Sequence, residues 1–372
     1  MALWKECTLS ELGTIVGGAT PSTKDEANYE NGDIPWITPK DLSTFTGRYI
    51  FNGERNITQK GLNSCSAQML PKNTVLFSSR APIGYVAIAG CPVCTNQGFK
   101  SIVPNDKTDS LFLYYLLKYN KEKIENMGSG TTFKEVSGGT MRNIKVIVPE
   151  DKDVQIKIGK ILGSIDDKIE TNTQINNNLY EQAVALFNND FPDIFSGNKA
   201  VGDYIVPKRG KSLLSKDAVL GKVPVVAGGL EPSTYHNVSN TTAPVITISA
   251  SGANAGYVNL WHTPVWSSDS SFIDAKMTPY VYFWYILLKK RQKEIYDSQT
   301  GSAQPHIYPQ HIASIEIQEL NLEKVNTFES QVKAIFELIG HNIVENSSLI
   351  EARNTLLPKL ISGEINVTDF DI

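Results

Sequence analysis

The chain has 372 residues, a formal net charge of −4, 41% hydrophobic residues and a mean hydropathy of −0.20. This length is sufficient for two domains, each with its own hydrophobic core. Its first residues lack the apolar segment of a signal peptide, no apolar run is long enough to cross a membrane, and there are only four cysteines; we therefore expect a cytoplasmic protein without disulfides.

The charge alternates along the chain and divides it into four segments. Residues 1–150 and 197–320 each carry a net charge of +2, whereas residues 151–196 and 321–372 each carry −4. We predict two globular domains, 1–150 and 197–320, each followed by an acidic helical segment, 151–196 and 321–372. A negative net charge is unusual for a protein that binds nucleic acid. The globular segments are mildly basic, however, and could still contact phosphates.

The first globular segment alternates short apolar runs with polar loops. In chain order we expect a strand or short helix at 3–16, strands at 32–37, 75–77, 85–89 and 144–148, and a helix at 109–126. Turn-forming loops are expected at 17–24, 78–84 and 128–132. This mixture of separate strands and helices indicates an α+β class with a twisted sheet in each globule.

Residues 154–187 carry the pattern of a long helix that packs along another helix. Apolar residues alternate spacings of four and three from Ile158 to Ile169, then Asn172 and Asn176 take the same positions. The pattern resumes at Leu179 and continues through Ala183 to Leu186. Polar residues on such a seam fix the register or the partner at a cost in stability.

The chain contains an internal duplication of domain size. The helical pattern recurs 174 residues later, where Ile158 corresponds to Val332 and Asn172 to Asn346. Residues 84–86 match 256–258 at a shift of 172, and Gly130 matches Gly301 at a shift of 171. We predict two long antiparallel helices of matched length in a pseudo-twofold arrangement, which would place one globule at each end.

Catalytic and metal-binding patterns are weak. Cys91 and Cys94 have half the spacing of a zinc site, but there is no second pair, so we interpret them as structural. No phosphate-binding loop or hydrolase nucleophile motif occurs. Asp166-Asp167-Lys168 faintly resembles a nuclease motif, but it lies on the predicted helix and reads better as a solvated flank. We predict no catalytic residues and no metal site.

The loops of both globules are rich in side chains that can read DNA. Arg, Asn, Gln and Ser can hydrogen-bond base edges, and Lys and Arg can hold phosphates. The candidates in the first half are Thr20, Ser22, Thr23, Lys24, Lys40, Arg80, Asn96, Gln97, Thr131 and Lys134. Those in the second half are Lys208, Arg209, Lys211, Ser249, Ser251, Asn254, Ser268, Asp269, Gln304 and His306. Corresponding positions are polar in both halves yet differ in identity, which favours two related readers of different sequences.

The whole chain resembles the specificity subunit of type I restriction-modification systems. The resemblance rests on residues 20–24 (TPSTK), 32–42 (GDIPWITPKDL), 70–76 (LPKNTVL), 95–97 (TNQ) and 357–364 (LPKLISGE). The second globule departs from the pattern, because residues 225–229 (VVAGG) replace the Trp-Ile-Thr-Pro stretch and Asp269 lies near the place of Gln97. Its contacts are therefore less transferable.

The resemblance implies a non-catalytic DNA-reading subunit. In that family the globules are target recognition domains, and the antiparallel helices are spacers that dock two modification subunits, sometimes with restriction subunits. It implies no cofactor in this chain, and S-adenosylmethionine, Mg²⁺ and ATP on the partners. We expect the partner helices to dock on the acidic outer faces, at Asp166, Asp167, Glu170 and Glu345.

Two other classes of function remain open at this point. The first is a helical scaffold whose globules bind protein or a small ligand rather than DNA. The second, a nuclease that acts by itself, is disfavoured by the missing motifs. A steep loss of DNA affinity with salt separates the first of these from a DNA reader.

Overall fold

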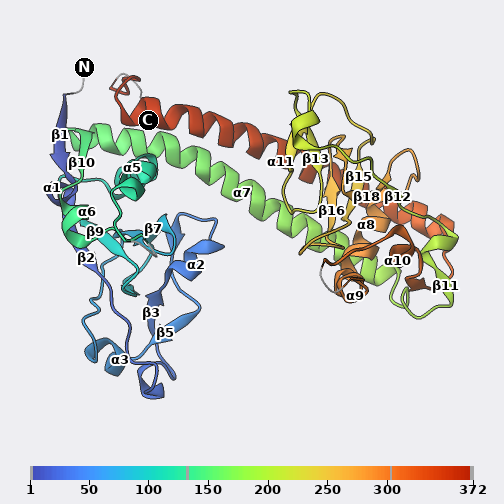
Figure 1. Ribbon diagram of the computed structural model, residues 1–372, viewed down its shortest axis with the longest axis horizontal. Helices are drawn as coiled ribbons and strands as arrows, with labels where there is room; N and C mark the ends of the chain where they lie inside the picture. Colours follow the sequence, from blue (N-terminus) through green and yellow to red (C-terminus); the bar gives the residue numbers. More distant parts are fainter. Residues whose placement is uncertain (1–2, 131–133, 302–303, 369–372) are drawn as a thin grey trace. The chain divides into compact units, whose positions relative to one another are not determined.

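The computed structural model describes residues 3–130, 134–301 and 304–368 (Figure 1). The chain divides into two compact units, Met1–Thr171 with Asn346–Ile372, and Asn172–Glu345. Both boundaries fall inside the long helices α7 (Lys152–Asp190) and α11 (Leu322–Ile361), so each unit combines a globular part with a segment of each helix. The division into four segments at 150, 196 and 320 stays a prediction.

The first unit is an α+β structure built around a five-stranded sheet, ordered β2–β9–β6–β7–β4. Its strands are β2 (Gly13–Gly17), β4 (Tyr49–Ile50), β6 (Val75–Ser79), β7 (Ile83–Ala89) and β9 (Lys100–Pro104). A three-stranded sheet contains β3 (Ile34–Ile37), β5 (Arg55–Ile57) and β8 (Cys94–Thr95), and β1 (Trp4–Thr8) pairs with β10 (Lys145–Pro149). The helical elements are α1 (Leu9–Leu12), η1 (Glu26–Asn28), α2 (Pro39–Ser43), α3 (Gln59–Asn63), α4 (Ser110–Tyr119), α5 (Lys121–Asn126) and α6 (Gly138–Arg142).

The second unit repeats this plan with a four-stranded sheet, ordered β12–β18–β15–β16. Its strands are β12 (Lys208–Arg209), β15 (Val245–Ser249), β16 (Val258–Trp261) and β18 (Ser270–Asp274). A three-stranded sheet holds β13 (Val223–Val226), β14 (Thr234–His236) and β17 (Trp266–Ser267), and β11 (Lys199–Ala200) pairs with β19 (Glu316–Ile317). Its shorter helical elements are η2 (Val201–Asp203), η3 (Ser215–Asp217), α8 (Val281–Lys290), α9 (Gln292–Asp297) and α10 (Pro309–Ala313).

The duplication predicted from the sequence is present in the pairing of the strands. In both units a central antiparallel ladder joins β6 to β7 and β9, or β15 to β16 and β18. The small sheets agree as well, since β3 and β13 each have one antiparallel and one parallel neighbour. The predicted α+β class with twisted sheets is thereby confirmed.

The long helices supply part of the core of each unit. In the first unit Ile158 and Leu162 of α7 and Leu360 of α11 join the core beneath the main sheet. In the second unit Phe187 of α7 packs with Phe328 of α11 and Phe283 of α8. Each globule is therefore held to its helix segments by apolar burial, the main stabilising term in folding.

The predicted heptad seam is wrong at two positions. Leu186 and Ile343 are 36% and 46% exposed, whereas their neighbours Phe187 and Asn342 are buried. The buried side chain thus lies one residue later than predicted on α7 and one residue earlier than predicted on α11.

The helix pair of the second unit has a polar layer. Asn342 donates its side-chain amide to Asn176 Oδ1 at 2.8 Å, and Asn172 donates to Glu345 Oε2 at 2.7 Å. In the first unit, Asn346 donates to the backbone oxygen of Ile169. The two helices are antiparallel, as predicted: as the residue numbers rise along α7, the numbers of their partners on α11 fall.

The structure also bears on two smaller predictions. Cys7, Cys65, Cys91 and Cys94 are free, and no cluster of metal-binding side chains occurs among the described residues. Within the same residues, no helix has the length and apolar character needed to cross a bilayer.

Candidate nucleic-acid interface

Three loops of the first unit are joined by backbone hydrogen bonds. Ser79 donates its backbone N–H to Gly98 O at 2.7 Å, and Val136 donates to Ser79 O at 3.0 Å. Ser129 and Glu135 exchange two backbone hydrogen bonds, which close the third loop. The predicted residues Arg80, Gln97 and Lys134 are thus carried by one cross-linked group of loops.

An acidic residue lies between two cations at this place. The Glu135 carboxylate lies 3.5 Å from Arg80 Nη1 and 3.4 Å from Lys100 Nζ. The sequence reasoning missed both Lys100 and Glu135. Lys100 and Glu135 come close only because strand β9 and the segment that carries Glu135 both lie beside the end of β6. No local sequence pattern indicates this packing.

The loop of residues 17–24 is fixed to the same region. Thr20 donates its hydroxyl to Gln97 Oε1, so two predicted residues are in direct contact. Behind them, Trp36 Nε1 donates to Ala19 O at 3.1 Å and the Tyr29 hydroxyl donates to Pro21 O at 2.6 Å. The loop therefore presents its polar side chains from a rigid support.

The remaining predicted residues that the structure describes in the first unit are exposed or make local contacts. Ser22, Thr23, Lys24 and Lys134 are exposed, and Lys40 is exposed and pairs with Glu54. Asn96 uses its side-chain oxygen to accept from Gly98 N at 2.8 Å, which shapes the turn that presents Gln97. Thr131 lies outside the described residues.

Arg55 is a further cation that the sequence reasoning missed. Its guanidinium carbon lies 4.2 Å from the centre of the Tyr29 ring. The pair lines a pocket of about 380 Å³ together with Thr23, Glu26 and Asn56. A guanidinium already in contact with an aromatic ring loses little freedom when it binds a ligand, so Arg55 belongs with the candidates.

The second unit builds its three loops in the same way. Ala250 donates its N–H to Asp269 O at 3.1 Å and Ile307 donates to Ala250 O at 2.9 Å. Thr300 and His306 exchange two backbone hydrogen bonds, as Ser129 and Glu135 do 171 residues earlier. His306 therefore stands where Glu135 stands in the first unit.

Three predicted residues of the second unit are in direct contact. Arg209 Nη2 donates to Asp269 Oδ1 at 2.7 Å, and the Ser251 hydroxyl donates to Asp269 Oδ2. Lys208, Lys211 and Gln304 are exposed. Asn254 and His306 are half-buried, and the His306 ring stacks on Tyr308 with centroids 6.1 Å apart.

Two residues of the second unit that were predicted to contact DNA, Ser249 and Ser268, are buried, so these two predictions are wrong. Ser249 ends β15, a strand whose five residues are all buried, and is itself 4% exposed. Ser268 is 6% exposed, and its hydroxyl accepts the N–H of Leu213 at 3.0 Å. Neither side chain is therefore available to a ligand.

The sequence also matches known proteins. Residues 1–181 match the family model described as the type I restriction modification DNA specificity domain. The MjaIX specificity subunit of Methanocaldococcus jannaschii is 33% identical, over 98% of this chain and 94% of that protein. This chain belongs to the specificity subunits of type I restriction enzymes.

Further similarities agree with this assignment. A putative type I specificity subunit of Mycoplasma pneumoniae is 27% identical over 78% of the chain and 83% of that protein. The crystal structure of a type I S subunit from Mycoplasma genitalium has the same fold, with a TM-score of 0.66, 19% identity and 96% of each chain covered. The chain is therefore the subunit that recognises the DNA sequence in its system, and it is not itself the enzyme.

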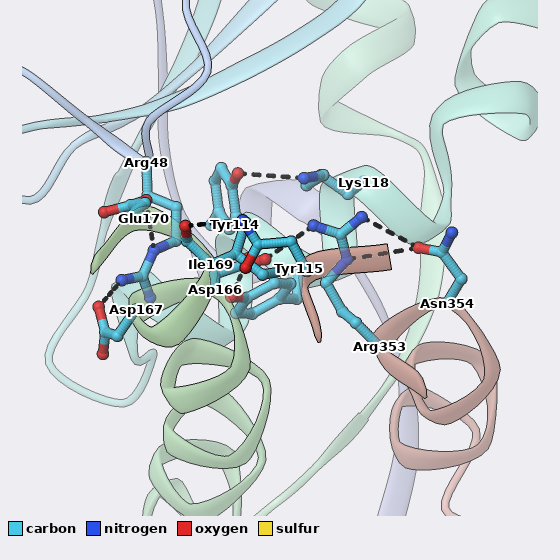
Figure 2. A network of polar contacts seen from close by, with 11 residues as sticks. Arg48, Tyr114, Tyr115, Lys118, Asp166, Asp167, Ile169, Glu170, Arg353 and Asn354 are labelled. Carbon is cyan, nitrogen blue, oxygen red and sulfur yellow. Dashed lines mark hydrogen bonds and ion pairs between the residues drawn. The ribbon is translucent and has the colours of Figure 1, made fainter. Parts of the chain in front are cut away.

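Three of the four predicted partner-binding carboxylates of this specificity subunit, Asp166, Asp167 and Glu170, make contacts within the first unit (Figure 2). Asp166 of α7 accepts the Tyr115 hydroxyl of α4 at 2.6 Å and Arg353 Nη1 of α11 at 2.7 Å. Asp166 is 6% exposed, so the prediction that it lies on a solvated outer face is wrong. Its acceptor oxygens hold three elements of the first unit together.

The neighbouring carboxylates hold Arg48 of the globular part. The Arg48 guanidinium is almost fully buried and pairs with Asp167 and, at 3.5 Å, with Glu170 (Figure 2). Burial lowers the pKa of Arg48, but Tyr115, Asp167 and Glu170 outweigh it and raise that pKa. Burial, followed by Asp166, raises the pKa of Tyr115, so this hydroxyl remains a donor.

Glu345, in the second unit, is exposed and accepts from Asn172. Glu345, like Asp167 and Glu170, therefore uses part of its hydrogen-bonding capacity on contacts within its own unit. The predicted docking of partner subunits on these residues stays a prediction.

Proposed function

We propose that each unit of this specificity subunit reads one part of a bipartite, asymmetric DNA target. The observation that carries the proposal is one loop scaffold, built twice, that presents different side chains. Glu135 in the first unit is replaced by His306 at the same place in the second, and Gly98, the neighbour of Gln97, is replaced by Asp269. Two scaffolds with different donors and acceptors favour two different half-sites, hence an asymmetric target.

The candidate residues divide into two groups by chemistry. Arg80 and Gln97 lie on the cross-linked loops of the first unit, Arg209 of β12 is joined to those of the second unit through Asp269, and these three arginine and glutamine side chains are the proposed base readers. Exposed lysines such as Lys24, Lys134, Lys208 and Lys211 are the proposed phosphate contacts, because a mobile ammonium gives affinity without sequence information. Ser249 and Ser268 are excluded from either role by their burial.

We further propose that the helices dock two modification subunits, which would supply S-adenosylmethionine and the methyl transfer. Where the system includes restriction subunits, these would join the same complex with Mg²⁺ and ATP. The contacts of Asp166, Asp167 and Glu170 within the first unit shift the proposed docking surface from the acidic faces to exposed apolar residues of α11. In the second unit these are Leu338, Ile343 and Val344, and exposed apolar helix positions fit a partner helix.

A salt titration of DNA binding tests the proposal. The chain is assembled with its modification subunits, and binding to a duplex with the mapped target is measured between 50 and 200 mM salt. Phosphate contacts require the affinity to fall by orders of magnitude across this range. A salt-independent affinity would instead support the scaffold alternative, and equal affinity for unrelated duplexes would contradict sequence recognition.

A further inference from the structure

We propose that Asp269 positions Arg209 to read a guanine in the half-site recognised by the second unit. This inference rests on the proposed function and adds the class of base and the residue that sets it. Asp269 is a positioning residue, since it acts through the Arg209 guanidinium, whereas Arg209 is the group that would touch the base.

The Asp269 carboxylate is held from two sides. Its Oδ1 accepts from Arg209 Nη2 at 2.7 Å, and its Oδ2 accepts from the Ser251 hydroxyl. The side chains of Arg209 and Asp269 are 44% and 38% exposed. The pair is therefore fixed in direction and still open to a ligand.

The backbone on both sides of the pair is fixed as well. Arg209 lies on β12, where it pairs with Ser271 of β18. The next two residues continue this attachment, because Gly210 donates to Ser270 O at 2.8 Å and Lys211 donates to Ser267 O at 2.9 Å. A Cβ at Gly210 would lie 2.4 Å from Ser267 O, so only glycine allows this approach.

The chemistry of the pair favours guanine. A guanidinium has five N–H donors, and one of them is spent on Asp269. The free donors match the O6 and N7 acceptors that guanine presents in the major groove, the commonest specific contact of arginine with a base. Because Asp269 has already fixed the side chain, little rotamer freedom remains to be lost on binding.

The first unit does not repeat this pair at the corresponding place. Gly98 accepts from Ser79 N where Asp269 accepts from Ala250 N. Gly17 pairs with Lys100 where Arg209 pairs with Ser271. Neither glycine has a side chain, so no carboxylate directs a guanidinium there, and Arg80 of the first unit pairs with Glu135 on another loop. The guanine read by Arg209 should therefore belong to the half-site of the second unit.

The experiment measures preference at each base pair of the mapped target. Duplexes with every single base-pair change are bound by complexes that contain the unchanged chain, Asp269→Asn, Arg209→Lys or Lys208→Ala. Asp269→Asn should reduce discrimination at one guanine of one half-site by about tenfold or more, and Arg209→Lys should reduce it at the same guanine. All other positions should keep their preference.

Lys208→Ala is the matched control, because Lys208 is the exposed neighbour of Arg209 on the same strand. It should weaken binding to all duplexes alike and reduce the salt slope by about one. If Asp269→Asn leaves discrimination unchanged, or alters every position alike, Asp269 is a structural residue and the inference is wrong. The proposed function fails separately, if the unchanged chain itself has no sequence preference.

Discussion

At the scale of single residues, α4 and α8 are the equivalent helices of the two units. Each has its start held by a side chain from a long helix, and the two side chains occupy equivalent positions. Buried Gln155 of α7 accepts from Asp109 N at 3.0 Å, just before α4. Glu329 of α11, which lies 174 residues later, accepts from Tyr282 N at 3.0 Å and Phe283 N at 2.8 Å in the first turn of α8. A half-buried carboxylate in the second unit thus corresponds to a buried amide in the first.

This replacement should make stability depend on pH. Burial raises the pKa of Glu329 from 4.5 to about 7, although its two backbone donors lower it. Between these values the folded state binds more protons than the unfolded state, so stability falls as the pH rises from about 5 to 8. The loss attributable to Glu329 is about 3 kcal/mol.

Urea denaturation at pH 5 and pH 8 measures this effect. Glu329→Gln should remove about 3 kcal/mol of pH dependence, while Glu323→Gln, at an exposed position of the same helix, should keep it. Equal pH dependence in both variants would contradict the assignment.

A second residue-scale prediction concerns Asp166. Asp166→Ala removes the acceptor of the Tyr115 hydroxyl and the carboxylate partner of the partly buried Arg353 guanidinium, which keeps its contacts with Asn354. The free energy of unfolding should fall by about 3 kcal/mol, the lower end for a broken buried pair, since Arg353 keeps some solvent contact. Lys160→Ala, at an exposed position of α7, should change it by less than about 0.5 kcal/mol. Similar losses in the two variants would show that the pair contributes nothing.

At the scale of elements, the sequence pattern located the long helices and several strands well. The expected helix at 109–126 is divided at Asn120 into α4 and α5, because the Asn120 amide turns back to Leu116 O. Periodicity does not reveal such local side-chain hydrogen bonds. The shift of the seam at Leu186 and Ile343 was likewise beyond a strict heptad pattern.

The polar layer of the helix pair gives a prediction at the same scale. Replacing both Asn176 and Asn342 with leucine exchanges a hydrogen-bonded pair for apolar packing. The free energy of unfolding should rise by about 1 kcal/mol, while pairing becomes less specific and self-association increases. Denaturation and light scattering measure the two effects; a more stable variant that stays monomeric would mean that these asparagines do not select the partner.

At the scale of the whole molecule, the duplication and the family resemblance were enough to predict the function from the sequence. They predicted only part of the candidate site. Arg209, Ser251 and Asp269 were predicted one by one, and the structure adds that they are in contact. Lys100, Glu135 and Arg55 were missed, and Ser249 was misplaced, because exposure depends on loops that meet only in the folded unit. Asp166 was misread for the same reason, since its partner Arg353 lies 187 residues away.

The proposed bipartite target gives a length prediction for the helices. Insertion of four residues into both helices adds about one turn and about 6 Å to each. If the helices set the distance between the readers, the gap between half-sites should lengthen by roughly two base pairs at about 3.4 Å each. The insertion must avoid the surface that holds the partner subunits, and assembly of the complex is the control. An unchanged gap in an assembled variant would exclude this role of the helices.

The central claim is that this one chain reads two unlike half-sites, and a map of methylated positions in host DNA, with and without its gene, tests it most directly. With the gene, the account predicts methylation at one sequence with two different specific parts separated by a gap of fixed length. Without the gene, this methylation should disappear. A continuous or palindromic sequence, or a methylation pattern that does not depend on the gene, would contradict the account.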